Sequence, residues 1–332
     1  MIVEARAPTR IDLAGGTLDI PPLDVLVPGA CTVNVAIDLL ATARVEPVPG
    51  GFEIVSVDRD LHLTCPDLDA LRADARAPLL TGLVAHLVPA GGVRLTTDCG
   101  SPAGAGLGGS SALAVAAGAA LAGFAGTPLP EDRLLAVARD VETRVLGVPT
   151  GVQDYLAAIR GGALSITFGI GGPAMERLAA DLEALQERTV LVYTGQPRSS
   201  GINNWEVTRR FVDGDREVGA RLETIARQAG RAQRALLAGD LDELAAAVGA
   251  EWAARRELAP GVTTPRLEAL FDAARRAGAV AAKVCGAGGG GCAVLLAPPG
   301  RRPAVEAAAR EAGARVLAFR FVPEGVVASG VD

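Results

Sequence analysis

Lysine is almost missing from this chain of 332 residues, since Lys283 is the only one among its 32 basic side chains. Aromatic residues make up 3% of the sequence, so the ring platforms on which proteins stack single-stranded nucleic acid are scarce. The net charge of −6 adds no attraction to nucleic acid or to an anionic membrane. We therefore expect neither as a partner. We attribute the shortage of lysine to compositional bias, with arginine in its place.

Paired cysteines and a leading apolar run are also missing. The five cysteines are scattered without a CxxC pair, which supports neither a zinc ribbon nor a disulfide framework. The opening stretch MIVEARAPTRIDL carries charges where a secretory signal has an apolar run. Residues 99–130 are uncharged, but they are mostly Ala and Gly and begin as a loop, which favours a buried helix over a membrane span. The sequence therefore predicts a soluble, cytoplasmic protein.

The first half of the chain mixes strand-like and helical segments. Strands are predicted at residues 2–5, 31–39, 41–47, 52–57, 93–97 and 163–167. Helices are predicted at 66–72, 78–87, 111–125 and 131–146, with a short one starting near Gly151. The glycine-rich loop 169–174 is the best candidate for a linker between two domains.

The second half restarts with a strand and then becomes mostly helical. Strands are predicted at residues 189–194, 280–285, 292–296 and 315–322. Helices are predicted at 203–238 with a break near 213–215, and at 241–258, 265–277 and 302–312. This alternation around an antiparallel pair predicts an α+β protein with an N-terminal domain at 1–170 and a ferredoxin-like domain at 171–332.

The most informative segment is 99–124, which reads CGSPAGAGLGGSSALAVAAGAALAGF. Glycine lets a backbone approach an anion closely, and a helix start offers unpaired N–H groups with a partial positive charge. Ser110 and Ser111 fall at that start, where a hydroxyl can cap the helix, bind phosphate or reach a metal ion. The segment predicts a site for the phosphates of a nucleotide.

Two other phosphate-binding motifs fit this segment poorly. Gly104, Gly106 and Gly109 satisfy the dinucleotide pattern GxGxxG, but the loop starts several residues after its strand, and the acidic residue expected about 20 residues on is replaced by a turn and a helix start. A Walker motif is excluded because it needs a lysine here. A glycine loop that serves packing alone would leave a second cluster, CGAGGGGC at 285–292, unexplained.

Three segments in order resemble the motifs of the GHMP kinases, the family of galactokinase, homoserine kinase, mevalonate kinase and phosphomevalonate kinase. PAGAGLGGSSA at 102–112 resembles the family's phosphate-binding motif. APTRIDLAGGTLDIPP at 7–22 resembles its N-terminal substrate motif, and KVCGAGGGGC at 283–292 its C-terminal glycine motif. The resemblance implies an N-terminal domain like domain 2 of ribosomal protein S5, followed by a ferredoxin-like domain.

The N-terminal motif is most similar to the branch of sugar kinases that includes heptose-phosphate kinase and fucokinase. Those enzymes typically read AGGGTD or SGGWSDTPP, whereas this chain reads AGGTLDIPP, with its threonine displaced. The resemblance implies that the acceptor is a sugar or sugar phosphate, preferably at its C1 hydroxyl. A mevalonate-type kinase is the alternative, although that branch normally has a lysine where this chain has Arg10. An NAD-binding oxidoreductase and a catalytically silent nucleotide-binding protein are the alternatives of a different class.

The resemblance also implies roles for individual residues in a reaction that uses ATP and Mg²⁺. Asp154 would accept or orient the proton of the attacking hydroxyl, and Arg10 would stabilise the transferring phosphoryl group or keep Asp154 ionised. Ser111 and Glu142 would hold Mg²⁺. The ATP phosphates would lie on Pro102, Gly104, Ala105, Gly106, Leu107, Gly108, Gly109, Ser110 and Ser111.

The acceptor would lie against the first and third motifs. Asp19 can accept two hydrogen bonds from neighbouring sugar hydroxyls. The other residues expected to contact or shape the acceptor site are Gly15, Gly16, Thr17, Gly286, Gly288 and Gly289. Arg198 would bind a substrate phosphate or cap the helix that follows it. The sequence leaves the oligomeric state open, a homodimer included.

Overall fold

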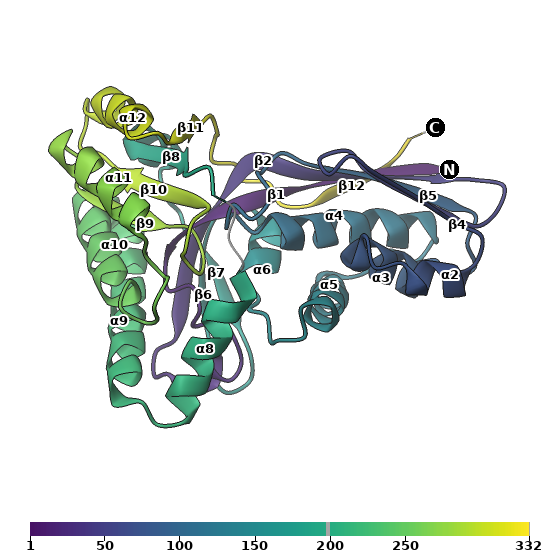
Figure 1. The fold of residues 1–332 in the computed structure, drawn as a ribbon, viewed down its shortest axis with the longest axis horizontal. Coiled ribbons are helices and arrows are strands. Elements are labelled where there is room, and N and C mark those ends of the chain that lie inside the picture. The colour runs from purple at the N-terminus through teal and green to yellow at the C-terminus, as the bar shows by residue number, and fades with distance from the viewer. Residues whose placement is uncertain (197–199, 332) are drawn as a thin grey trace.

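The computed structural model describes residues 1–196 and 200–331, and it contains two sheets with helices packed on them (Figure 1). The first sheet has eight strands, ordered β12-β1-β2-β5-β3-β4, with β6 and β7 added along β2. Its strands are β1 (Ile2–Ala14), β2 (Cys31–Pro47), β3 (Phe52–Ser56), β4 (Leu61–Cys65), β5 (Val93–Cys99), β6 (Ala163–Thr167), β7 (Ala174–Arg177) and β12 (Val327–Val331). Helices α1 (Leu23–Leu26), α2 (Leu68–Ala73), α3 (Pro78–Leu87), α4 (Gly109–Phe124), α5 (Glu131–Leu146) and α6 (Gln153–Arg160) belong to this half of the chain.

The second sheet has four antiparallel strands in the order β11-β8-β10-β9. They are β8 (Thr189–Tyr193), β9 (Ala281–Val284), β10 (Cys292–Leu296) and β11 (Arg315–Leu317). The helices around it are α7 (Leu182–Arg188), α8 (Ser200–Val212), α9 (Arg216–Ala238), α10 (Leu241–Arg255), α11 (Pro265–Arg276) and α12 (Arg302–Glu311). Two sheets with helices packed on them confirm the predicted α+β class.

Local capping explains where the long helices of the second half begin and end. Asp215 accepts hydrogen bonds from the N–H groups of Glu217 and Val218, so α9 starts there and the chain breaks at the predicted place. Gly239 takes a left-handed conformation (φ +68°) that ends α9, and Asp240 caps α10 directly afterwards. Because α9 ends and α10 begins within two residues, the chain reverses there and the two helices pack side by side (Figure 1).

The two longest strands, β1 and β2, each contribute side chains to two different hydrophobic cores. At the start of β1, Val3 and Ala5 pack in the core that α4 completes. Further along the same strand, Ile11 and Leu13 pack in a second core with side chains of α9 and α10. The polar residues between and beside these stretches, Arg10 among them, therefore lie where the two cores meet.

The strand predictions were wrong in length or missed an element at several places. β1 continues to Ala14 because its later charged side chains are buried and paired, which the alternating pattern of a half-buried strand does not anticipate. β2 is one strand, and β4, β7 and β12 were not predicted. The strand predicted at 315–322 ends at Leu317, after which Phe321 bridges to Ile37 of the first sheet.

The glycine-rich loop at 169–174 forms a hairpin connection, because β6 and β7 on either side of it pair with each other. The last strand, β12, likewise pairs with β1 in the first sheet. The division into domains 1–170 and 171–332 stays a prediction, with two strands of the second segment in the first sheet.

The uncharged stretch that follows β5 is a buried helix. Most side chains of α4 are buried, and the helix lies along the underside of β1 and β2 (Figure 1). Among the described residues, none of the helices combines the length and the apolar character needed to cross a bilayer.

Candidate active site

A cavity of about 570 Å³ lies where the first sheet, α4, α6 and the second half of the chain come together. The phosphate-loop residues Pro102, Gly104, Ala105, Gly106, Leu107, Gly108, Gly109, Ser110 and Ser111 all line it. Arg10, Thr17, Asp19, Glu142, Asp154 and Gly286 line it as well. The cavity thus collects predicted residues from all three sequence motifs.

The phosphate loop passes directly beside Asp154. Gly108 has φ +72° and is the last residue before α4, and a Cβ at this position would lie 3.2 Å from Cβ of Asp154. Ser110 and Ser111 consequently fall in the first turn of α4, where neither hydroxyl caps the helix. The loop presents the start of α4, with its partial positive charge, to the cavity.

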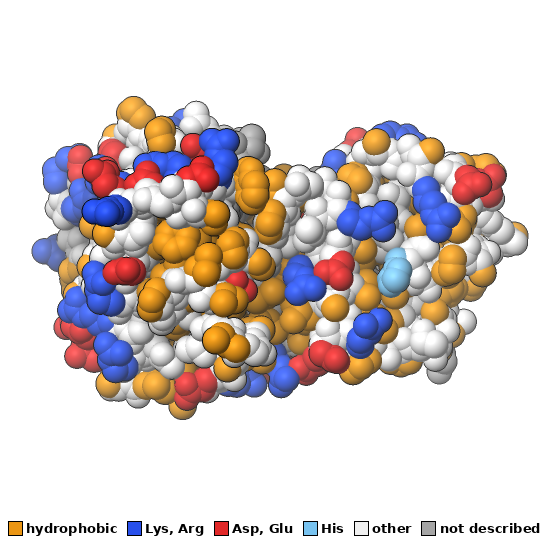
Figure 2. Space-filling model, turned by 90° about the horizontal axis from the view of Figure 1, so that it is seen from below, with side chains coloured by type: hydrophobic (Ala, Val, Ile, Leu, Met, Phe, Trp, Pro, Cys, Tyr) orange, Lys and Arg blue, Asp and Glu red, His pale blue; other side chains and the backbone are white. Residues whose placement is uncertain are grey.

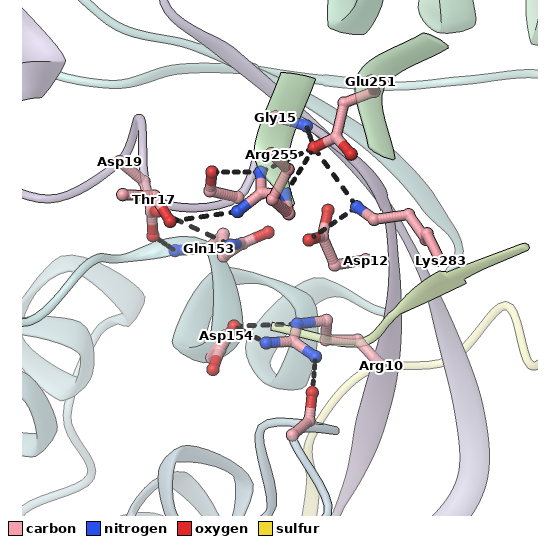
Figure 3. Close-up of polar contacts among 12 residues, drawn as sticks. Arg10, Asp12, Gly15, Thr17, Asp19, Gln153, Asp154, Glu251, Arg255 and Lys283 are labelled. Atoms are coloured by element: carbon pink, nitrogen blue, oxygen red, sulfur yellow. Dashed lines mark hydrogen bonds and ion pairs between the residues drawn. The ribbon is translucent and has the colours of Figure 1, made fainter. Parts of the chain in front are cut away.

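Arg10 joins the loop to Asp154. Its Nη2 and Nε lie 2.6 and 2.8 Å from Oδ1 of Asp154, and its Nη1 donates to the carbonyl of Gly106 at 2.6 Å (Figure 3). Burial disfavours the charge on Arg10, but Asp154 and Asp12 outweigh it and raise the pKa of the guanidinium. The Asp154 side chain is 26% exposed, so its carboxylate is accessible from the cavity.

Glu142 gathers three hydroxyl groups at the other side of the loop. Ser110 Oγ donates to Oε1 at 2.5 Å and Ser111 Oγ donates to Oε2 at 3.0 Å. Tyr155 Oη donates to the same Oε2, and burial together with the charge of Glu142 raises the pKa of this phenol. Glu142 is buried on α5 yet borders the cavity, as the ligand role requires.

This donor set fits Mg²⁺, which prefers oxygen ligands and is often held by one or two carboxylates together with substrate phosphates and water. The structure supplies one carboxylate, Glu142, and the serine hydroxyls next to the phosphate loop. No group of three or more His, Cys, Asp or Glu side chains that could hold a metal occurs within 1–196 and 200–331. A magnesium ion here would therefore share its coordination with the nucleotide.

Asp19 contacts the helix that carries Asp154. Its Oδ2 accepts a hydrogen bond from the backbone N–H of Gln153, the first residue of α6, at 3.0 Å. A Cβ at Gly151 would lie 1.9 Å from Oδ2, so only glycine allows this approach. Burial, together with the negative charge of Asp154, raises the pKa of Asp19 to about 7.

Residues 15–17 form a tight turn at the end of β1. Gly15 has φ +88°, and a Cβ there would lie 1.9 Å from the carbonyl oxygen of Cys31. Thr17 has φ +76°, which is uncommon for a β-branched residue. Its Oγ1 donates to Oδ1 of Asn204 on α8 at 3.1 Å, and both side chains line the cavity. Asn204 was not predicted, and the sequence around it carries no motif that marks it.

A buried ionic cluster lies behind this turn (Figure 3). Lys283 Nζ is 3.0 Å from Oδ2 of Asp12 and 3.4 Å from Oε1 of Glu251, and Arg255 Nη2 is 2.6 Å from the same Oε1. Compositional bias accounts for the absence of lysine elsewhere but not for its presence here. The single lysine was the only feature of the sequence that could have indicated this cluster. Asp12, Glu251 and Arg255 were not predicted as members of it.

The second glycine cluster packs against the first. The backbone N–H of Cys292 donates to the carbonyl of Ala105 at 2.6 Å, and a Cβ at Gly291 would lie 2.6 Å from the same oxygen. Gly286 lines the cavity, whereas Gly288 and Gly289 lie against the backbone of Val262. Arg198 falls outside the described residues.

The chain belongs to the GHMP kinase family. The model of the GHMP kinase N-terminal domain matches residues 77–162, and the model of the GHMP kinase C-terminal domain matches residues 232–315. Both the phosphate loop and the Lys283 motif fall inside these matches.

The similar proteins include a sugar kinase and a mevalonate kinase. The D-glycero-alpha-D-manno-heptose 7-phosphate kinase of Campylobacter jejuni is 27% identical, over 98% of each chain. The mevalonate kinase of Pyrococcus horikoshii is 32% identical, over 71% of this chain and 68% of its own. The structure of a D-glycero-D-manno-heptose 1-phosphate kinase from Bacteroides thetaiotaomicron superimposes with a TM-score of 0.81 at 25% identity, over 99% of each chain.

These findings confirm the predicted class of enzyme. The chain is an ATP-dependent kinase that transfers a phosphoryl group to a hydroxyl group of a small molecule. The oxidoreductase alternative is wrong, since the dinucleotide-binding fold needs a parallel, doubly wound sheet and β1, β2 and β5 pair antiparallel here.

Proposed function

We propose that this kinase phosphorylates a sugar phosphate, with heptose 7-phosphate as the first acceptor to test and the C1 hydroxyl as the reacting group. The observation that carries the proposal is the position of Asp154, held by Arg10 at 2.6 Å between the phosphate loop and Asp19. Similarity to a heptose-phosphate kinase along 98% of both chains supports the choice of acceptor class.

Asp154 performs the proton step in this proposal. Its Oδ1 binds Arg10, and its carboxylate reaches the cavity, where it accepts the proton of the attacking hydroxyl. Phosphoryl transfer proceeds through a loose transition state that asks little base strength, so an ordinary carboxylate suffices. Arg10 holds the Asp154 carboxylate in place through its ion pair and lies close to the charge that develops on the phosphoryl oxygens.

The nucleotide is held by the other side of the cavity. Residues 104–109 and the start of α4 line the cavity, where their backbone N–H groups would surround the ATP phosphates. Glu142 and Ser111 would hold Mg²⁺, which would neutralise negative charge on the phosphates. We assign the acceptor contacts to Asp19, Thr17 and Gly286, which line the cavity, while Gly15 and Gly16, which do not line it, shape the turn that carries Thr17.

A mevalonate-type kinase is the second candidate, favoured by the 32% identity to an archaeal mevalonate kinase. A catalytically silent nucleotide-binding protein is disfavoured, because Ser111, Glu142 and Asp154 all border one cavity. On the face shown in Figure 2, acidic and basic side chains are interspersed, which fits small-molecule substrates rather than nucleic acid. We infer a cytoplasmic enzyme, where ATP is available, and a homodimer is compatible with it.

The test is an acceptor panel with ADP release as the readout. Heptose 7-phosphate, free heptose, fucose, galactose and mevalonate are each supplied with ATP and Mg²⁺, and phosphorus NMR locates the new phosphate ester. We expect turnover with a sugar phosphate, and we expect it to fall by about 10²–10⁴-fold in Asp154→Ala. If mevalonate were the one acceptor of the panel to be phosphorylated, the proposal would be wrong and the mevalonate-type kinase would take its place.

A further inference from the structure

We propose that Arg255 is a positioning residue for the acceptor turn at residues 15–17, acting with Glu251 and Lys283 from the second half of the chain. The inference rests on the proposed function, in which this turn presents Thr17 to the acceptor. It assigns a role to three buried side chains that do not line the cavity.

The guanidinium of Arg255 is bonded on both of its sides (Figure 3). Towards the turn, Nη2 donates to the carbonyl of Gly16 at 2.5 Å and Nη1 donates to Thr17 Oγ1 at 3.1 Å. Towards its own helix, Nε and Nη2 donate to Glu251 Oε1 at 2.8 and 2.6 Å. The planar fork of an arginine is fixed when it is bonded on both edges, and this one is 1% exposed.

The turn needs this support because its backbone is strained. Thr17 sits in the left-handed region at φ +76°, a conformation that costs free energy and persists only when the surroundings hold it. Glu251 Oε1 also accepts the N–H of Gly15 at 3.2 Å. Helix α10 therefore bonds to all three residues of the turn: to the N–H of Gly15, the carbonyl of Gly16 and the hydroxyl of Thr17. These three bonds together hold the turn in its shape.

The remaining two members of the cluster hold Glu251 in place. Lys283 bridges Glu251 to Asp12, so two positive and two negative side chains, each almost fully buried, balance one another. Burial acts to raise the pKa of Asp12, but Lys283, Arg255 and Arg10 outweigh it and keep the pKa below its ordinary value. Breaking one pair would leave a buried charge uncompensated, so the cluster strongly favours this one arrangement.

The cluster connects to the reacting groups by two short routes. Asp12 lies two residues from Arg10 on β1, and side chains two apart on a strand share a face, so the cluster adjoins the residue that holds Asp154. On the other route, Thr17 Oγ1 accepts from Arg255 and donates to Asn204, and Thr17 and Asn204 line the cavity. An acceptor hydroxyl would meet Thr17 and Asn204 in the positions that Arg255 sets.

The first test does not depend on the acceptor. Arg255→Lys keeps the positive charge, but a single ammonium cannot reproduce the fork to Gly16, Thr17 and Glu251. We expect amide hydrogen exchange at residues 15–17 to become about tenfold faster or more. The matched control is Arg188→Lys, since Arg188 is also buried and bonded to a carbonyl and a carboxylate, those of Ala297 and Asp242. Exchange in the turn should be unchanged in that control, and unchanged exchange in Arg255→Lys would overturn the inference.

The second test separates positioning from stability. With heptose 7-phosphate as the acceptor, Arg255→Lys should raise the acceptor KM by about 10–100-fold, because Thr17 is no longer held in position to contact the acceptor, with the KM for ATP unchanged. Arg188→Lys should lower the melting temperature and leave both KM values unchanged. An acceptor KM that does not move in Arg255→Lys would reduce Arg255 to a structural role. If the parent chain turns over no sugar phosphate, the proposed function fails, while the exchange experiment still decides the inference.

Discussion

The two sides of the cavity are built in different ways. The phosphate side is formed by one short loop and the helix that follows it, and backbone groups and glycines dominate it. The acceptor side is supported from behind by residues that are far apart in sequence: the Gly15 N–H bonds to Glu251 across 236 residues, and Asp12 bonds to Lys283 across 271. Phosphates present the same chemistry in every nucleotide, whereas the acceptor side must distinguish one hydroxyl compound from another.

This contrast teaches which changes each side tolerates. A backbone site can be damaged by a side chain that fills it, since a Cβ added at Gly108 would lie only 3.2 Å from Cβ of Asp154. A side-chain site depends on charge balance and on hydrogen-bond geometry, which a single substitution of similar size removes. The predictions below test this contrast, from the largest expected effect to the smallest.

Removing the carboxylate that stands between the two sides should have the largest effect. We expect Asp154→Ala to lower kcat by about 10²–10⁴-fold, the range of a positioned general base, and to leave ATP binding largely intact. Steady-state ADP release and calorimetric titration of a non-hydrolysable ATP analogue measure the two quantities. Full turnover in this variant would refute the role of Asp154.

Replacing the single lysine by a neutral residue should destabilise the folded protein through the ionic cluster behind the acceptor side. Lys283→Met leaves Asp12 and Glu251 with less compensation in the interior, so we expect the free energy of unfolding to fall by about 3–5 kcal/mol. Urea titration followed by circular dichroism gives this value. Arg188→Met is the control, and it should cost less because its carboxylate partner, Asp242, is 83% exposed. An equal fall in the free energy of unfolding in Lys283→Met and Arg188→Met would show that charge balance in the cluster does not add to stability.

Changing the acidic residue beneath the phosphate side should act through the metal. We expect Glu142→Gln to raise the Mg²⁺ concentration needed for half-maximal rate by about 10–100-fold, because a neutral amide is a poorer ligand than a carboxylate. Asp140→Asn, on the same helix but exposed and paired with Arg139, serves as the control and should leave the magnesium curve in place. A curve that is the same for Glu142→Gln as for the parent chain would remove Glu142 from the metal site.

The pH dependence of stability should show the contribution of Asp19. Its pKa is raised to about 7 in the folded protein, so between pH 4 and 7 the folded state holds a proton that the unfolded state has lost. Asp19 therefore makes stability fall with rising pH in that window, by at most about 1.4 kcal/mol per pH unit, and adds no further slope above pH 7.

The difference in unfolding free energy between the parent chain and Asp19→Asn isolates this contribution, because other titrating groups cancel. It should decline from pH 4 to 7 and then level. A difference that is flat across the whole range would show that Asp19 titrates in the folded state as it does in the unfolded one.

The phosphate side could be predicted from the sequence because its signals are local. A glycine loop, two serines and a following helix are contiguous, and every predicted loop residue borders the cavity. Asp154 and Glu142 were assigned through the resemblance to the GHMP kinases, and the structure brings both to the same cavity. Their roles in catalysis and metal binding stay predictions.

Thr17, Asp19 and Gly286 were predicted for the acceptor side and line the cavity, but the ionic cluster behind them could not be predicted in the same way, because its residues look ordinary in the sequence. Glu251 and Arg255 have the i, i+4 spacing of a common solvent-exposed helix pair, yet both are fully buried. Arg10 and Asp12 interrupt the apolar pattern of a strand, so the sequence predicted β1 only over residues 2–5 although it runs to Ala14. Only the fold reveals that these charges neutralise one another across the chain.

The burial of Lys283 has a practical consequence for chemical labelling. Because this side chain is fully buried and no other lysine exists, amine-directed reagents have no accessible side-chain ε-amine in the folded protein. Reaction at Lys283 would therefore report the moment when α10 and β9 separate from β1. A lysine introduced on the surface would be the one accessible ε-amine of the folded protein, a defined attachment point beside the N-terminal amine for a fluorophore, a cross-linker or a solid support.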